Sequence, residues 1–208
     1  MNILIADDHA IVRKGLIELI REAYPSANIT EVVNSHEVLD QVAKQTWSII
    51  LMDISMPGRN GVETLKQIRS NGVKTPILML SAHPEDQYAL RVLKAGASGF
   101  LNKDIATDEL LAAISKILSG KKYISAAVAE MLAEFQTDTS HKSAHELLSD
   151  REMQMLQLIG SGKTVSEIAE QISLSVNTIS TYRTRLLEKL CLKNNAELIK
   201  YAIDHGLV

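Results

Sequence analysis

The chain has 208 residues, of which 46% are hydrophobic and 23% are charged, and its formal net charge is −3. This near-neutral charge gives no overall signature of nucleic-acid or membrane binding, and no apolar run approaches the ~20 residues of a membrane span. The single cysteine, Cys191, excludes an internal disulfide and a zinc site built from several cysteines, and the N-terminus carries no basic leader. We therefore expect a cytoplasmic protein of one or two domains with no membrane partner.

Short apolar runs alternate with amphipathic segments over the first 118 residues. The expected strands are residues 3–6, 29–33, 48–53, 76–81 and 99–103. The expected helices are residues 9–23, 35–44, 61–70, 85–95 and 107–118, with Ser35 as a candidate N-cap of the second. Five strand–helix units in succession predict an α/β fold with a doubly wound parallel sheet and helices on both faces.

The pattern changes after Gly120. Residues 126–135 can form a helix, and residues 136–143 are polar without apolar periodicity. Residues 1–125 carry 14 side chains of each sign and residues 147–208 carry seven of each, whereas residues 126–146 carry one basic and four acidic side chains. We therefore expect a first domain over residues 1–122, a helical, acidic linker over 123–146, and a second domain over 147–208.

The last 60 residues or so have a helical pattern throughout. Two capping boxes, Ser149 with Glu152 and Thr164 with Glu167, each precede an apolar stripe. The expected helices begin at these boxes and continue with residues 176–190 and about 196–205. Two capped helices joined by a tight turn are typical of a DNA-binding helix-turn-helix, and a small helical interaction bundle is the alternative.

Polar residues follow the expected strands of the first domain at one sheet edge: Asp7 and Asp8, Asp53, Ser81 and Lys103. At an effective dielectric of ~20, two carboxylates about 4 Å apart repel by roughly 4 kcal/mol. Mg²⁺ relieves such repulsion and suits carboxylates that also receive a phosphoryl group. A carboxylate in this setting can act as a nucleophile toward phosphorus, Lys103 can neutralise phosphoryl oxygens, and the Ser81 hydroxyl can donate to one of them. Each residue alone could simply end a strand, but together they favour a phosphoryl site.

Several motifs resemble known domains at this point. Asp7-Asp8 and the segments 52–57 (MDISMP), 80–83 (LSAH) and 96–103 (GASGFLNK) resemble a response-regulator receiver domain. The segments 148–152 (LSDRE), 166–169 (SEIA) and 176–190 (VNTISTYRTRLLEKL) resemble a LuxR-type DNA-binding domain. Nearly the whole chain is thus similar to two-component regulators of the NarL/FixJ class. That class implies a five-stranded, flavodoxin-like receiver and a small four-helix helix-turn-helix domain.

The resemblance implies roles for the residues at the sheet edge. Asp53 would be the phosphoacceptor, taking a phosphoryl group from a sensor histidine kinase. Ser81 and Phe100 would be the switch pair, although an aromatic residue in a short strand is also an ordinary core residue. The implied Mg²⁺ ligands are Asp8, Asp53 and the Ser55 carbonyl, with Asp7 acting through water.

The expected recognition helix, residues 176–190, carries a net charge of +2 within a neutral domain. Because phosphate contacts supply most non-specific DNA affinity, we expect a monomer to bind weakly and to need pairing on two half-sites. Val176, Ile179, Leu186 and Leu190 are expected to face inward. The expected DNA contacts are Ser180, Thr181 and Thr184 to base edges, Tyr182, Arg183 and Arg185 to phosphates or bases, and the outward Asn177 and Lys189.

Three positions depart from the LuxR-type pattern. Cys191 stands where relatives often have glycine, and we expect a buried, inert cysteine there. Asn195 stands where relatives often have arginine. Arg183 lies near the inward face, so its side chain is expected to snorkel toward solvent.

The combined expectation is a transcription regulator, not an enzyme, that is controlled by phosphorylation. Its expected partners are a sensor histidine kinase, double-stranded promoter DNA and a second copy of the phosphorylated chain, with RNA polymerase as a further candidate. Two other classes stay open. One is a phosphatase with an aspartate nucleophile, and the other is a phosphorylation-independent DNA-binding or interaction protein with a vestigial acidic pocket.

Overall fold

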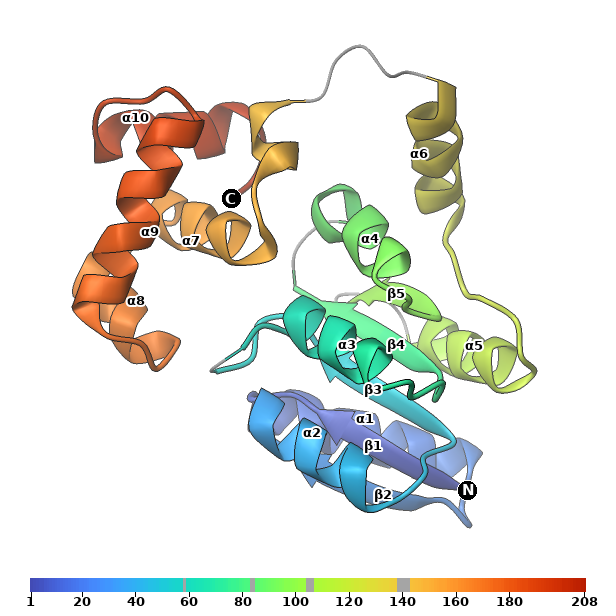
Figure 1. The fold of residues 1–208 in the computed structure, drawn as a ribbon. Helices are drawn as coiled ribbons and strands as arrows, with labels where there is room; N and C mark the ends of the chain where they lie inside the picture. Colours follow the sequence, from blue (N-terminus) through green and yellow to red (C-terminus); the bar gives the residue numbers. More distant parts are fainter. Residues whose placement is uncertain (58, 83–84, 104–106, 138–142) are drawn as a thin grey trace. The chain divides into compact units, whose positions relative to one another are not determined.

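The structure is a computed structural model that describes residues 1–57, 59–82, 85–103, 107–137 and 143–208. The chain divides into two compact units, Met1–Thr137 and Asp138–Val208, which are described separately (Figure 1). Among the described helices, none is long and apolar enough to cross a membrane.

The first unit is a five-stranded parallel sheet in the order β2-β1-β3-β4-β5. Its strands are β1 (Asn2–Ala6), β2 (Asn28–Val32), β3 (Ile49–Asp53), β4 (Ile77–Ser81) and β5 (Gly99–Asn102). Its helices are α1 (Ala10–Ala23), α2 (Ser35–Lys44), α3 (Gly61–Ser70), α4 (Glu85–Lys94), α5 (Thr107–Leu118) and α6 (Ala126–Thr137). The predicted doubly wound α/β fold is confirmed, and the observed element ends lie at most two residues from the expected ones.

The sheet is buried on both faces because helices cover each side (Figure 1). Every residue of β3 and β4 is buried, which explains their continuous apolar runs. On one face, alternate strand residues such as Ile5 and Leu51 pack against α1 and α5. The helices α2, α3 and α4 contact one another in turn over the other face. This packing holds the central strand rigidly and so fixes the place where Asp53 ends it.

The N-cap of α2 is Asn34 and not Ser35, so that expectation was wrong. Asn34 has the extended backbone that an N-cap needs, and its side chain accepts a hydrogen bond from the Glu37 amide at 2.9 Å. Ser35 is already helical, and its hydroxyl instead accepts a hydrogen bond from the Arg59 amide at 3.1 Å. The serine thus ties α2 to the loop that follows β3.

Two features of the first unit lie away from the sheet edge. The helix α6 packs against α4 and buries Val128, so it belongs to the first unit although it lies within the expected linker. Residues 138–142 of that linker lie outside the described residues. Trp47 precedes β3 and is buried, and its indole N–H donates to the Gln41 carbonyl at 3.2 Å.

The second unit contains a short 3-10 helix that was not predicted, η1 (Ala144–Leu147), and four α-helices. These are α7 (Asp150–Gly160), α8 (Val165–Gln171), α9 (Val176–Lys189) and α10 (Asn195–Asp204). Both predicted capping boxes are confirmed, with Ser149 and Thr164 as N-caps and Glu152 and Glu167 at the third helical position. Helices α7 and α10 pack together, and α9 contacts both α7 and α8.

Cys191 is exposed, so the expectation of a buried cysteine was wrong. It follows Leu190, the C-cap of α9, and its φ is +55°. The Cys191 amide donates to the Glu188 carbonyl at 3.2 Å and the Leu192 amide to the Leu187 carbonyl at 2.8 Å, which is a Schellman motif. The motif needs a left-handed residue at this position, and that backbone turns the cysteine side chain outward. Glycine adopts this conformation at lower cost.

Candidate functional site

The carboxyl edge of the sheet brings Asp7, Asp53 and Lys103 into contact. Ala6 and Met52 are paired across β1 and β3, so the two aspartates that follow them leave the sheet at the same level. The Lys103 ammonium lies 2.7 Å from Asp7 Oδ2 and 2.9 Å from Asp53 Oδ2. Both carboxylates are buried, with Asp53 only 1% exposed. The sequence prediction that these residues meet at one edge is therefore confirmed.

The charges of this pocket are only partly balanced. Burial raises the pKa of Asp53 above its ordinary value, and the neighbouring Asp7 adds to this, while Lys103 lowers the pKa without reversing the shift. Burial alone would lower the pKa of Lys103, but the carboxylates of Asp53 and Asp7 outweigh it and the net shift is upward. Lys103 is therefore a fixed cation at neutral pH, and it holds two carboxylates that repel each other.

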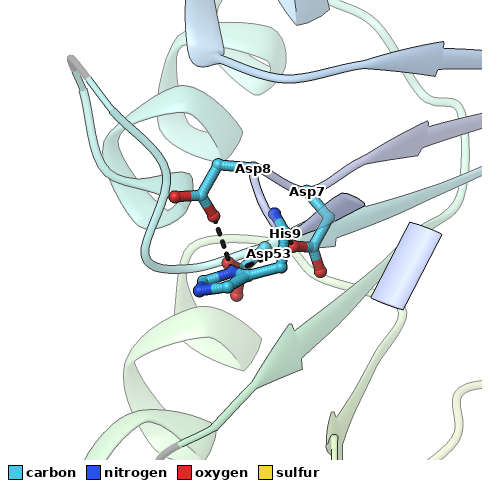
Figure 2. A group of neighbouring side chains, drawn as sticks. All are labelled: Asp7, Asp8, His9 and Asp53. Atoms are coloured by element: carbon cyan, nitrogen blue, oxygen red, sulfur yellow. Dashed lines mark hydrogen bonds and ion pairs between the residues drawn. The ribbon is translucent and has the colours of Figure 1, made fainter. Parts of the chain in front are cut away.

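Asp8 and His9 complete the acidic edge in the loop between β1 and α1 (Figure 2). The His9 ring lies against both aspartates, with Nδ1 at 2.9 Å from Asp8 Oδ1 and 3.3 Å from Asp7 Oδ1. Candidate ligand atoms of Asp7, Asp8, His9 and Asp53 all lie within 4.8 Å of one another. Asp53 Oδ1 is buried and accepts no hydrogen bond of normal geometry from the described residues. The cluster could therefore hold a metal ion, and its oxygen donors suit a hard cation.

Sequence reasoning missed two residues of this site. His9 directly follows the aspartate pair, and this adjacency was the only available signal. Arg13 lies one turn into α1 and is mostly buried. Its guanidinium donates to the Asp7 carbonyl at 2.8 Å and to Glu31 Oε2 at 3.2 Å. Arg13 thus fixes the loop that carries the aspartates, and nothing in its sequence spacing indicated this.

The remaining residues expected at the phosphoryl site lie in the strands β4 and β5 and in the loop after β3. Ser81 ends β4 and is fully buried, and its carbonyl accepts a hydrogen bond from the Lys103 amide at 2.7 Å. Phe100 is buried in β5, as expected of a core residue. Ser55 lies in the loop after β3 and is partly buried. Gly61 opens α3 so close to Asp53 that an added Cβ would lie 2.2 Å from the Asp53 carbonyl oxygen.

In the second unit, α9 presents a polar face to solvent. Six of the residues expected to contact DNA are exposed, namely Asn177, Ser180, Thr181, Thr184, Arg185 and Lys189, whereas Tyr182 and Arg183 are half-buried. A depression of about 300 Å³ on this face is lined by Asn177, Thr178, Thr181, Tyr182 and Arg185. The hydroxyls of Thr181 and Thr184 donate to carbonyls one turn earlier, so their outward oxygens are available as hydrogen-bond acceptors.

Three residues of α9 differ from the simple expectation. Val176 was expected to face inward, but it is 48% exposed because it is the first helical residue and projects beyond the bundle. The Lys189 ammonium lies 2.7 Å from Glu152 Oε2, so it has a structural partner within the second unit. The Arg183 guanidinium donates to Asn195 at the start of α10. The two departures at positions 183 and 195 are therefore physically linked.

The sequences of both units are similar to known protein families. Residues 3–115 match the response regulator receiver domain, and residues 146–202 match the LuxR family of bacterial regulatory proteins. The chain belongs to the two-component response regulators of the NarL/FixJ family. In this family a receiver domain is followed by a LuxR-type helix-turn-helix domain, and the chain is accordingly a DNA-binding transcription regulator controlled by phosphorylation.

Individual relatives match along the whole chain. The response regulator UvrY of Escherichia coli K12 is 34% identical over 208 residues, which cover 100% of this chain and 95% of UvrY. The response regulator GacA of Pseudomonas aeruginosa PAO1 is 30% identical, with 100% and 98% covered. The structure of RcsB from Salmonella enterica serovar Typhimurium, bound to the promoter P1flhDC with the phosphomimetic BeF3−, matches with a TM-score of 0.60 and 27% identity, covering 97% of each chain.

Proposed function

We propose that Asp53 accepts a phosphoryl group from a sensor histidine kinase, and that this modification promotes dimerisation and promoter binding in the cytoplasm. The observation that carries the proposal is the buried Asp53 carboxylate, which Lys103 holds at 2.9 Å beside Asp7. Because the Lys103 ammonium pairs with both buried carboxylates, it can change its partner when Asp53 is modified. The full-length similarity to UvrY and GacA supports the same assignment.

The transfer uses Asp53 as the nucleophile. One of its carboxylate oxygens forms a bond to phosphorus while the phosphorus–nitrogen bond of the phosphohistidine breaks, and the imidazole keeps that electron pair and takes up a proton. The Lys103 ammonium pairs with the phosphoryl oxygens, and the Ser81 hydroxyl donates a hydrogen bond to one of them. When bound by Asp8, Asp53 and the Ser55 carbonyl, with Asp7 acting through water, Mg²⁺ would offset the negative charge that gathers at this edge.

Phosphorylation would change the packing of the first unit through its charge. A phosphoryl group brings about two negative charges at neutral pH and three strong acceptor oxygens. Lys103, which directly follows β5, then has a new partner, and Ser81, the last residue of β4, has a new hydrogen-bond acceptor. We propose that the Ser81 hydroxyl moves toward the phosphoryl group and that Phe100 turns inward behind it, which alters the surface formed around β4 and β5.

The output domain would read promoter DNA with α9. RcsB binds promoter DNA in structures with BeF3−, and another structure contains two RcsB dimers bound to DNA. By analogy, we propose that residues 147–208 bind double-stranded promoter DNA as one half of a dimer, with residues 123–146 connecting them to a receiver of residues 1–122. RNA polymerase is a further proposed partner. The proposed contacts are Asn177, Ser180, Thr181, Tyr182, Arg183, Thr184, Arg185 and Lys189.

Sedimentation velocity of the full chain, with and without beryllofluoride and Mg²⁺, tests the proposal. We expect wild type to shift from monomer to dimer only when both reagents are present, and Asp53→Asn to stay unchanged. Equal behaviour of the two proteins would contradict phosphoryl control through Asp53. In that case the phosphorylation-independent binding protein becomes the better description.

A further inference from the structure

His9 occupies the N-cap position of α1 but does not cap the helix. Its backbone is extended, as an N-cap requires, yet its side chain makes no cap hydrogen bond. The ring turns toward the aspartates instead, so that Nδ1 faces Asp8 Oδ1 at 2.9 Å and Asp7 Oδ1 at 3.3 Å (Figure 2). The His9 amide also donates to Asp7 Oδ1 at 2.8 Å. A nitrogen donor therefore lies at the mouth of a pocket that is otherwise lined by carboxylate oxygens.

The negative charge of the pocket is only partly balanced by the positive charge in contact with it. Three carboxylates meet there, and among the described residues Lys103 is the permanent cation in contact with them. The Lys103 ammonium contacts Asp7 through Oδ2 and Asp53 through Oδ2, which leaves Asp7 Oδ1 beside His9. Asp53 Oδ1 is buried and accepts no hydrogen bond of normal geometry from the described residues. A buried carboxylate oxygen in this condition can accept a water or a cation, and the mutual repulsion of the three carboxylates favours the cation.

The donor set and its spacing select a class of metal. Carboxylates alone suit Mg²⁺, whereas an imidazole nitrogen beside carboxylates suits ions of intermediate softness such as Zn²⁺ and Co²⁺. Zinc bonds of about 2.0–2.1 Å place the ligands of a tetrahedral site roughly 3.3 Å apart. The His9 separations from Asp8 and Asp7, 2.9 and 3.3 Å, are close to that value. Because the four candidate ligand atoms span at most 4.8 Å, only small side-chain movements would close the set.

We infer that the pocket also binds a divalent transition-metal ion through His9 Nδ1 together with the aspartates, and that this ion competes with phosphoryl acceptance by Asp53. The competition has a geometric cause. A four-coordinate zinc site with only protein ligands has no free position, whereas Mg²⁺ retains positions that waters or phosphoryl oxygens occupy. The metal site itself stands on the geometry, and its regulatory effect rests on the proposed phosphorylation of Asp53.

Direct metal binding to the full chain tests the site. Co²⁺ would be titrated and followed by its visible absorption, Zn²⁺ would be measured by competition with a chromogenic chelator, and Mg²⁺ by calorimetry. We expect His9→Gln to weaken Zn²⁺ and Co²⁺ binding about ten-fold or more and to reduce the Co²⁺ absorption. Its Mg²⁺ affinity should stay within about two-fold of wild type, because oxygen ligands dominate Mg²⁺ binding.

Two variants control for other donors. His36 is also an exposed histidine beside an aspartate, with Nδ1 3.4 Å from Asp40 Oδ2 on α2, so His36→Gln should leave all three affinities unchanged. Cys191→Ser removes the exposed thiol and should do the same. Equal Zn²⁺ affinity in wild type and His9→Gln would overturn the inference. A parallel loss of Mg²⁺ affinity would overturn it as well, because His9 would then only order the loop.

Phosphoryl loading tests the competition. Wild type and His9→Gln would be incubated with acetyl phosphate and excess Mg²⁺, with and without Zn²⁺ at a concentration that saturates the wild-type site. We expect Zn²⁺ to reduce the phosphorylation of wild type and to leave the phosphorylation of His9→Gln unchanged. An equal reduction in both proteins would overturn the proposed competition. Absence of loading in Mg²⁺ alone would instead contradict the proposed function, while the titrations would still decide whether the metal site exists.

Discussion

At the scale of single residues, Asp53 lies in a pocket that stabilises its neutral form relative to its charged form. Burial raises its pKa above 3.8, Asp7 adds to the rise, and Lys103 opposes it only in part. A carboxyl group whose pKa is higher in the folded state stabilises the fold below its unfolded pKa, and this contribution is lost as the pH rises through the folded value. At neutral pH, in the absence of a divalent cation, the ionised Asp53 therefore destabilises the first unit.

We expect Asp53→Asn to increase the free energy of unfolding at pH 7, because the amide removes a buried, incompletely balanced charge. The gain should shrink as the pH falls toward the folded pKa of Asp53, since the wild-type carboxyl then becomes neutral too. Urea unfolding in chelator, followed by Trp47 fluorescence at several pH values, measures this. Asp40→Asn, on the surface of α2, is the control and should show no comparable gain. A less stable Asp53→Asn at pH 7 would contradict the interpretation.

Cys191 shows a residue whose conformation is dictated by its neighbours. Its φ of +55° is required by the Schellman motif at the end of α9, and a non-glycine residue adopts this region at a cost of about 1–2 kcal/mol. We therefore expect Cys191→Gly to stabilise the second unit by about 1 kcal/mol, as measured by thermal unfolding. Cys191→Ala keeps the Cβ and should give no such gain. Equal stability of the glycine and alanine variants would contradict this account.

The site residues that could be predicted from the sequence are those that directly follow a strand. Asp7, Asp53 and Lys103 each follow an apolar run, and parallel strands bring their carboxyl ends to one edge, so their meeting could be inferred from the sequence. His9 and Arg13 could not, because their roles depend on side-chain directions around a loop. The exposure of Val176 was missed for a related reason, since helical periodicity does not show where the bundle ends.

At the scale of elements, the start of α3 sets the position of the phosphoacceptor loop. An alanine Cβ at position 61 would lie 2.2 Å from the Asp53 carbonyl oxygen and 2.9 Å from Ile54 Cα. We expect Gly61→Ala to destabilise the first unit by about 1–3 kcal/mol, because backbone must move to accommodate the methyl group. The same shift should weaken Mg²⁺ binding, which calorimetry would measure.

Gly15 provides a matched control in α1. Nothing lies within 4 Å of a Cβ added there, and the residue is inside the helix. Gly15→Ala should therefore stabilise the unit by roughly 0.5–1 kcal/mol, because alanine loses less backbone entropy in a helix. Similar effects of the two substitutions would show that helix propensity, and not the close approach to Asp53, governs position 61.

Most helices and strands could be predicted because the periodicity of apolar residues and the positions of capping residues indicated the same boundaries. The capping boxes of α7 and α8 placed both helix starts correctly. The cap of α2 was misplaced because Asn34 and Ser35 are adjacent good N-caps, and only the backbone conformation decides between them. The helix η1 spans four residues, too few for any periodic signal. The packing of α6 on α4 is a tertiary contact without a local signature.

At the scale of the whole molecule, the neutral charge of the helix-turn-helix domain, residues 147–208, limits DNA affinity. Residues 147–208 carry seven basic and seven acidic side chains, and Lys189 is already paired with Glu152. We expect the beryllofluoride-loaded chain to bind a duplex with two half-sites at least about ten-fold more tightly than one with a single half-site. Duplexes selected from a random-sequence pool, with one half-site then scrambled, would measure this by fluorescence anisotropy. Equal affinity for both duplexes would contradict the need for pairing.

The location of Trp47 has a consequence for the thermodynamics of the molecule. It is the single tryptophan of the chain, it is buried beside β3 in the first unit, and the helices α7–α10 contain none. Its emission therefore reports unfolding of the first unit alone, whereas far-ultraviolet circular dichroism reports both units. Coincident transitions by the two probes would mean that the units unfold as one cooperative system, and separate transitions would assign each unit its own stability.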